Sequence, residues 1–140
     1  MSLSLKETSP YVFTAANHAG ASLTITATPE LSGDALGMRP TELLPCALAS
    51  CTSIDLRLII EKQRQRIDSL ETEINMQRDE NQTPKVITHI RLTYKLRGEI
   101  DADKARRALE LASEKYCTVY KHLSPTIAID YRLEINGEPC

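Results

Sequence analysis

Two cysteines are the residues of this chain whose type and spacing best suit covalent chemistry. Cys51 ends the run Pro45-Cys-Ala-Leu-Ala-Ser-Cys51, and Cys117 follows 66 positions later in Glu114-Lys-Tyr-Cys117-Thr-Val. The sequence contains no Gly-rich phosphate loop and no HExxH, CxxC or GxSxG pattern. If the protein is an enzyme, sulfur is therefore the expected reactive element.

Both cysteines fall in segments with helical periodicity. Residues 41–65 carry apolar side chains at spacings of three and four, which predicts one long helix with a buried face. That face comprises Leu44, Ala47, Leu48, Cys51, Ile54, Leu58 and Ile59. A second helix is expected from a cap at Asp101 or Asp103 to about Leu123, because Pro125 cannot continue it. Cysteines on two buried helices could meet across the core as a peroxidatic and a resolving thiol.

The alternative is that these cysteines only fill space. Free cysteine is among the most buried residue types, and burial raises a thiol pKa unless a cation or a helix N-terminus stabilises the thiolate. Asp55, one helical turn after Cys51, adds a negative charge instead. Cys117 has the same alternative, and Cys46, about 140° round the helix from Cys51, is assigned to packing. Cys140 is the last residue and is expected to be mobile.

The remaining elements predict an α+β fold. Residues 22–28 alternate polar and apolar side chains and are expected to pair with the shorter stretch 11–13. Residues 67–78 and 86–96 predict an antiparallel hairpin, and residues 127–135 predict a final strand. The predicted order is ββ-α-ββ-α-β. A central helix this apolar needs more cover than one small sheet provides, which favours a homodimer.

Composition excludes several classes of function. A length of 140 residues with 41% hydrophobic content predicts a single domain, residues 1–140. The net charge of -2 and the scattered lysines and arginines give no reason to expect nucleic acid as a partner. No run reaches the roughly 18 apolar residues of a membrane span, and the N-terminus does not resemble a secretion signal. We therefore expect no membrane partner, a cytoplasmic location and reduced thiols. The three histidines lack metal-ligand spacing with any cysteine, so no metal is expected.

The two cysteine segments resemble those of a known family. The run from Gly37-Met-Arg-Pro40 through Cys51-Thr-Ser-Ile-Asp55 is similar to the central helix of the OsmC/Ohr family, and Ala105 to Val119 is similar to its second helix. The sequence around both cysteines is most similar to that of the YhfA-like branch of this family. The resemblance implies an OsmC-like fold, an intertwined homodimer with a long buried central helix, and a site at the dimer interface.

The resemblance also implies a chemistry. Family members reduce organic hydroperoxides and hydrogen peroxide, so Cys51 would be the peroxidatic nucleophile and Cys117 the resolving thiol of an intramolecular disulfide. An external dithiol would reduce that disulfide, and no metal or organic cofactor is implied.

The same resemblance leaves two functional alternatives open. Peroxidatic members pair the cysteine with an arginine held by a glutamate ten residues before it. Here Thr41 stands at that position, residues 1–38 contain no arginine, and Glu42 and Arg39 are the nearest possible helpers. The alternatives are a non-catalytic homodimer that binds a small apolar or thiol-containing ligand at its interface, and a slow redox sensor.

Overall fold

Residues 3–26 build a three-stranded antiparallel sheet. The computed structural model describes residues 2–140, which form two compact units divided between Leu44 and Pro45. In the first unit, β1 (Leu3–Ser9), β2 (Val12–Asn17) and β3 (Ser22–Thr26) pair in that order. The β2–β3 pair confirms the predicted pairing. Strand β1 was not predicted, and the short helix α1 (Pro29–Ser32) lies where a loop was expected.

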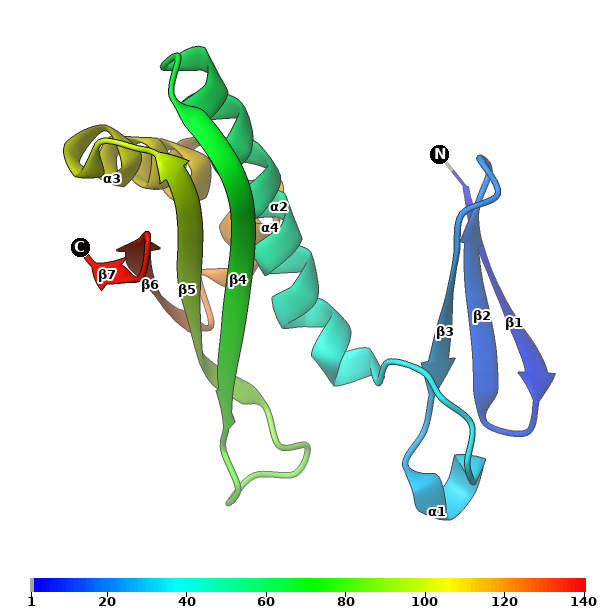
Figure 1. Ribbon diagram of the computed structural model, residues 1–140. Coiled ribbons are helices and arrows are strands. Elements are labelled where there is room, and N and C mark those ends of the chain that lie inside the picture. Colours follow the sequence, from blue (N-terminus) through cyan, green and yellow to red (C-terminus); the bar gives the residue numbers. More distant parts are fainter. Residues whose placement is uncertain (1) are drawn as a thin grey trace. The chain divides into compact units, whose positions relative to one another are not determined.

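The second unit contains a four-stranded sheet with the strand order β4-β5-β6-β7. Strands β4 (Arg66–Arg78) and β5 (Ile87–Glu99) make the predicted antiparallel hairpin (Figure 1). Strand β6 (Ala128–Ile135) pairs in parallel with β5, and the short β7 (Glu138–Pro139) returns antiparallel to β6. The parallel pairing places the long connection from β5 to β6, with its helices, across one face of the sheet.

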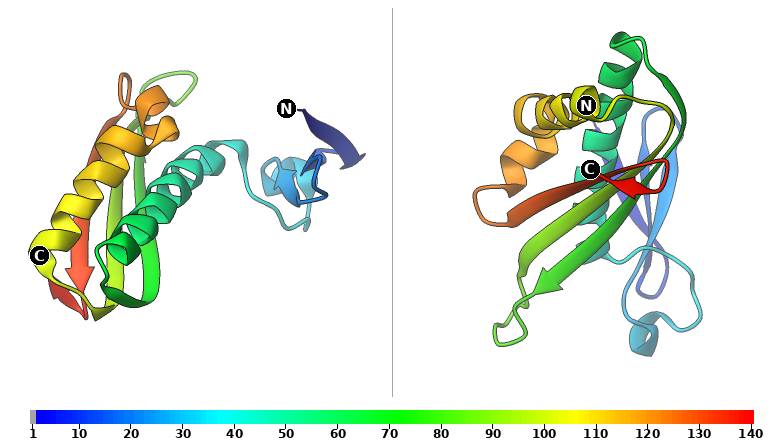
Figure 2. Two further views of the ribbon diagram at one scale, coloured as in Figure 1. Left: turned by 90° about the horizontal axis from the view of Figure 1, so that it is seen from above. Right: turned by 60° about the vertical axis from the view of Figure 1, so that its left-hand side comes forward.

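Helices cover that face of the sheet. They are α2 (Pro40–Lys62), α3 (Ala102–Glu110), the π-helical turn η1 (Leu111–Tyr116) and α4 (Thr118–Leu123). Within the second unit, α2 and α3 lie over the same side of the strands (Figure 2). Asp101 is the N-cap of α3, since its side chain accepts a hydrogen bond from the N–H of Lys104 at 3.0 Å. This confirms one of the two predicted caps.

The core lies between these helices and the inner face of the sheet. Leu92, Tyr94 and Leu96 alternate along β5 and are almost fully buried, as period-two alternation predicts. Leu48, Leu56 and Ile60 cover them from α2. The small side chains of α3 and η1 that belong to this core, Ala105, Ala108 and Ala112, let the helix approach the strands closely.

The predicted buried face of α2 is wrong in part. Its buried residues are Pro45, Leu48, Ala49, Thr52, Leu56 and Ile60. Leu44, Ile54 and Leu58, predicted to be buried, are 44%, 68% and 46% exposed. The helix is apolar on two faces, so periodicity alone could not select the one that packs on the sheet. Thr52 lies on the chosen face because its hydroxyl meets Tyr94 there.

Helix α2 is both long and apolar. An 18-residue window of this helix reaches a mean hydropathy of 1.6, enough by length and composition to cross a membrane. No such segment was expected from the sequence. Core helices of soluble proteins meet the same criterion, and one face of α2 packs into the core of the second unit. We interpret α2 as a core helix.

The second predicted helix is interrupted. A continuous helix to Leu123 was expected, but it passes into η1 and then breaks at Cys117, whose backbone is extended with φ -76° and ψ 111°. Helix α4 starts directly after it. Cys117 therefore lies at a helix junction rather than within a helix, and its side chain can serve as a cap.

Candidate functional site

The structure brings Cys51 and Cys117 together in the second unit. Cys51 lies on α2, is partly buried, and packs against the core. Cys117 is fully buried at the η1–α4 junction. Cys51 packs against the core cluster to which Cys117 belongs, and it is one of the groups that raise the pKa of Cys117. Residues 66 positions apart thus form a thiol pair, which can interconvert with a disulfide.

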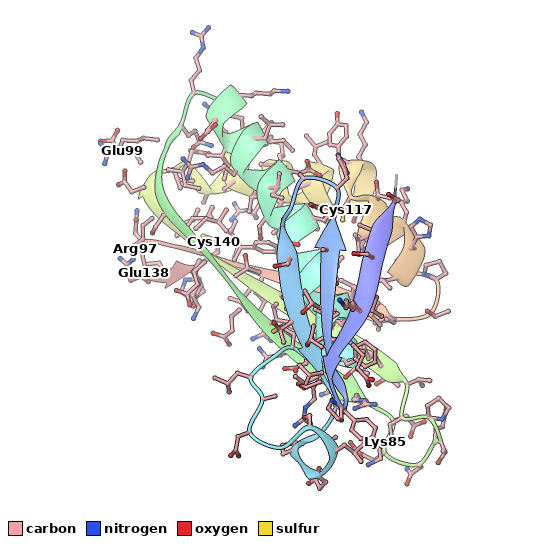
Figure 3. The ribbon with its side chains drawn as sticks, turned by 90° about the vertical axis from the view of Figure 1, so that its right-hand side faces the viewer. Lys85, Arg97, Glu99, Cys117, Glu138 and Cys140 are labelled. Atoms are coloured by element: carbon pink, nitrogen blue, oxygen red, sulfur yellow. The ribbon has the colours of Figure 1, made fainter. Side chains whose placement is uncertain are left out.

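The environment of Cys117 favours its protonated form. Burial is the main cause that raises its pKa from 9.0 to about 11, and the neighbouring Cys51 thiol adds to this. The backbone N–H of Tyr120 donates a hydrogen bond to Cys117 Sγ at 3.2 Å and opposes the shift. Cys117 is therefore a neutral thiol at neutral pH. Figure 3 labels Cys117 among the helices, away from Cys140.

Two hydroxyl groups, those of Thr52 and Tyr94, form a hydrogen-bonded pair in the same core. Tyr94 of β5 is fully buried, and its hydroxyl shares a short hydrogen bond with Oγ1 of Thr52, the residue after Cys51. The Thr52 hydroxyl also lies 3.0 Å from the carbonyl oxygen of Leu48 and 3.2 Å from that of Ala49. Burial raises the pKa of Tyr94 well above its ordinary value, and both thiols contribute to the shift. This hydroxyl pair ties the Cys51 turn of α2 to the centre of the sheet.

Sequence reasoning did not single out these two residues. Tyr94 was predicted only as one apolar member of an alternating strand, and Thr52 was not assigned a role. A threonine directly after a cysteine in a helix was the one available signal. Its partner, 42 positions away, could be found only from the fold.

A second tyrosine extends the cluster. The Tyr131 ring lies 6.1 Å from that of Tyr94 and 6.2 Å from that of Tyr120, centroid to centroid. Its hydroxyl is buried and has no hydrogen-bond partner within the described part of the chain. The Ser113 hydroxyl donates to the carbonyl oxygen of Leu109 at 2.7 Å, and Ser113 is also one of the groups that act on the pKa of Tyr131, which it lowers. Burial, followed by the influence of Tyr94, raises the pKa of Tyr131.

Glu42 has a structural task at the start of α2. Its Oε1 accepts a hydrogen bond from the backbone N–H of Arg39 at 2.9 Å. This is the reach-back of a capping box, in which a glutamate at the third helical position satisfies the amide of the N-cap residue. Both predicted helpers, Arg39 and Glu42, belong to the first unit, whereas Cys51 and Cys117 belong to the second. A role for either helper at Cys51 stays a prediction.

The other two cysteines lie outside the thiol pair. Cys46 is partly buried on α2. Cys140 is exposed, and its backbone N–H donates to the carbonyl oxygen of Leu133 at 2.9 Å, so its main chain is held against β6. It lines a groove of about 700 Å³ together with Ser113 and Tyr131. Among residues 2–140, no three His, Cys, Asp or Glu side chains are grouped to hold a metal ion.

The fold and this site define an α+β protein with one buried and one partly buried thiol at its core. The sequence profile of the family described as OsmC-like protein matches residues 33–132. The protein YhfA of Escherichia coli K12 is 33% identical over 97 residues, which are 69% of this chain and 72% of YhfA. The chain therefore belongs to the OsmC-like protein family.

Solved structures agree with this assignment at the level of the fold. A hypothetical protein from Aquifex aeolicus VF5 has a TM-score of 0.81 at 23% identity, with 96% of both chains covered. An OsmC-like protein from Mycoplasma pneumoniae has a TM-score of 0.77 at 20% identity, over 96% of this chain and 94% of that one. The organic hydroperoxide resistance protein OhrB of Bacillus subtilis has a TM-score of 0.61 at 18% identity, with 96% of both chains covered.

Proposed function

We propose that this protein is a thiol-dependent peroxidase that reduces organic hydroperoxides in the reducing cytoplasm. The observation that carries the proposal is the packing of Cys51 against the core cluster that contains Cys117, inside one unit. Family membership supports it, because structural neighbours of the same fold include proteins named for organic hydroperoxide resistance. The high pKa of Cys117 assigns the roles, since a thiol that stays protonated is a poor first nucleophile.

In the first step, the Cys51 thiolate attacks one oxygen of the hydroperoxide. A sulfur–oxygen bond forms, the O–O bond breaks, and the alkoxide takes up a proton and leaves as the alcohol. Cys51 is then a sulfenic acid. Its partly buried position beside an apolar core suits a hydroperoxide with a carbon tail.

In the second step, the sulfur of Cys117 attacks that of the Cys51 sulfenic acid. The S–S bond forms, the S–O bond breaks, and the hydroxyl leaves as water with the proton of the Cys117 thiol. An external dithiol then reduces the disulfide and becomes a disulfide itself, which returns both cysteines to thiols. No metal or organic cofactor takes part in this cycle.

We further propose that residues 1–140 act as one OsmC-like domain in a homodimer. The face of α2 that the sheet does not cover carries Leu44, Ala47, Ile54 and Leu58, which flank Cys51 at alternating spacings of three and four. This is the spacing with which one helix packs along another. A second copy of the chain offers the same face, and two-fold pairing would cover both copies and enclose the hydroperoxide beside Cys51.

The test follows free thiols in the reduced protein after addition of an alkyl hydroperoxide. Wild type should lose two thiols and form a disulfide, while Cys51→Ser should not react and Cys117→Ser should stop at a trappable sulfenic acid. Cys46→Ser is the matched control on the same helix and should behave as wild type. Loss of thiols no faster than that of a free model thiol would exclude catalysis and favour the ligand-binding dimer.

One observation favours a redox sensor as the second candidate. Within residues 2–140, the groups that shift the pKa of Cys117 include no lysine or arginine, so no cation assists its ionisation. Slow oxidation to the disulfide would then change the protein without turnover. Disulfide formation over minutes, with no continued consumption of hydroperoxide when a dithiol is added, would select this function.

A further inference from the structure

The thiol pair needs a group that stabilises negative charge on sulfur, and the core offers no cation. Among the described residues, neither the groups that shift the pKa of Cys117 nor those that shift the pKa of Tyr94 include a lysine or arginine. A hydrogen-bond donor is the other means of stabilising a thiolate in a buried site. Such a donor must meet two requirements: it must lie close to the sulfurs, and its proton must be free to turn toward them.

Tyr94 satisfies the first requirement. Its hydroxyl is hydrogen-bonded to Thr52 Oγ1, and Thr52 directly follows Cys51 on α2. Tyr94 and Cys117 belong to one core cluster, Cys51 packs against it, and both thiols contribute to the raised pKa of Tyr94. Because burial holds its pKa above the ordinary value, Tyr94 keeps its proton at every pH at which the protein would act.

The second requirement is met by the proton arrangement of the hydroxyl pair. A threonine hydroxyl has one proton and can accept two hydrogen bonds. In one arrangement Thr52 donates to the carbonyl oxygen of Leu48 and accepts from Tyr94. In the other, Thr52 donates to the Tyr94 oxygen, and the Tyr94 proton becomes available to a sulfur. Exchange between the two needs only rotation of two O–H bonds.

We propose that Tyr94 donates a hydrogen bond to the sulfur of Cys51 when that sulfur becomes a thiolate and then a sulfenic acid. This rests on the proposed function and adds to it the residue that replaces a cation. The Tyr94 proton stays on its oxygen throughout. The thiol proton of Cys51 leaves to solvent, and the protons of the peroxide cycle are those already accounted for.

Other titratable groups face the same site and must be separated from Tyr94. They are Cys117 at the η1–α4 junction, Tyr120 on α4 and Tyr131 on β6, and Asp55 follows Cys51 by one helical turn on α2. Tyr131 is the natural control, because it is a second buried tyrosine of the same cluster whose hydroxyl does not bond to Thr52.

The experiment measures the alkylation rate of Cys51 by iodoacetamide against pH, without hydroperoxide. Cys46, Cys117 and Cys140 are replaced by serine in all proteins, so that Cys51 is the one reactive thiol. Tyr94→Phe should raise the midpoint of the profile by about one pKa unit and slow alkylation at pH 7 about tenfold. Tyr131→Phe should leave the midpoint unchanged.

Thr52→Val separates donation from packing. Valine has the shape of threonine, so this variant breaks the same Thr52–Tyr94 hydrogen bond as Tyr94→Phe but leaves the Tyr94 donor in place. Its midpoint should stay within a few tenths of a unit of the parent protein. The proposal is overturned if Tyr94→Phe leaves the profile unchanged, or if Thr52→Val or Tyr131→Phe shifts it equally.

The experiment needs a control for folding. Near-UV circular dichroism and thermal unfolding identify variants that fold. If Tyr94→Phe does not fold, Tyr94→Leu takes its place as the variant without the hydroxyl; a rise of about one unit is expected there too, and an unchanged midpoint overturns the proposal. Since no peroxide is used, failure of the peroxidase function would leave this measurement intact.

Discussion

The backbone N–H of Tyr120 donates a hydrogen bond to Cys117 Sγ across 3.2 Å, so the thiol is the N-cap of α4. Serine can take over this cap through its hydroxyl, whereas alanine leaves a partly buried N–H without a partner. We expect Cys117→Ser to be more stable than Cys117→Ala by about 1 kcal/mol in the free energy of unfolding. Urea unfolding under reducing conditions measures both, and an alanine variant equal to the serine variant would show that the cap contributes nothing.

The same thiol predicts a dependence of stability on pH. Its pKa is raised from 9.0 to about 11, mainly by burial, which favours the protonated form in the folded protein. Between about pH 9 and pH 11 the unfolded chain therefore binds fewer protons than the folded protein does. The free energy of unfolding decreases as pH rises through this range.

Cys117→Ala lacks this group and isolates its effect. The stability advantage of wild type over Cys117→Ala should shrink by about 1–3 kcal/mol from pH 8.5 to pH 11. Comparing the two proteins cancels the contributions of the titratable groups that both contain. An advantage that grows with pH would contradict the cause given for the shift.

Tyr131 carries a buried hydroxyl without a partner in the described structure. Tyr131→Phe removes that group and keeps the ring that stacks near Tyr94 and Tyr120. We expect the variant to be as stable as wild type or more stable by up to about 1 kcal/mol, because an unpaired buried hydroxyl costs free energy. Thermal unfolding decides, and a clear loss of stability would mean that the hydroxyl is bound to a partner such as an ordered water.

Two variants of Glu42 distinguish a capping role of this residue from a catalytic one. Glu42→Gln keeps an oxygen that can accept from the Arg39 N–H, while Glu42→Ala removes it. We expect glutamine to cost little and alanine to cost about 0.5–1 kcal/mol of stability, with thiol oxidation unchanged in both. Oxidation slowed in both variants alike would instead give the carboxylate a part in the chemistry.

The uncovered face of α2 predicts the oligomeric state. Ile54 is 68% exposed at the centre of that face. A charge there would be buried without a partner in a helix-to-helix interface, so Ile54→Glu should shift a dimer to a monomer in analytical ultracentrifugation. Arg57→Ala, a change on an exposed neighbouring position, is the control and should remain a dimer. A monomeric wild type would remove the proposed interface.

Much of the fold could be predicted because local patterns determine it. Strand alternation predicted β4, β5 and β6, the apolar run predicted α2, and Asp101 was one of two predicted caps. Each depends on residues a few positions apart. Strand β1 was missed because its leucines, Leu3 and Leu5, are exposed, so its alternation does not follow a buried face.

The sequence alone determined the reactive element, the order of the main elements and the resemblance to a family, since residue identity and short-range periodicity carry all three. Only the tertiary structure decided which face of α2 is buried, because two apolar faces compete and the sheet selects the one bearing Thr52. It also broke the second helix at Cys117 and brought that thiol to Cys51. Contacts between residues 42 or 66 positions apart depend on how strands and helices pack, and periodicity along the chain does not encode that packing.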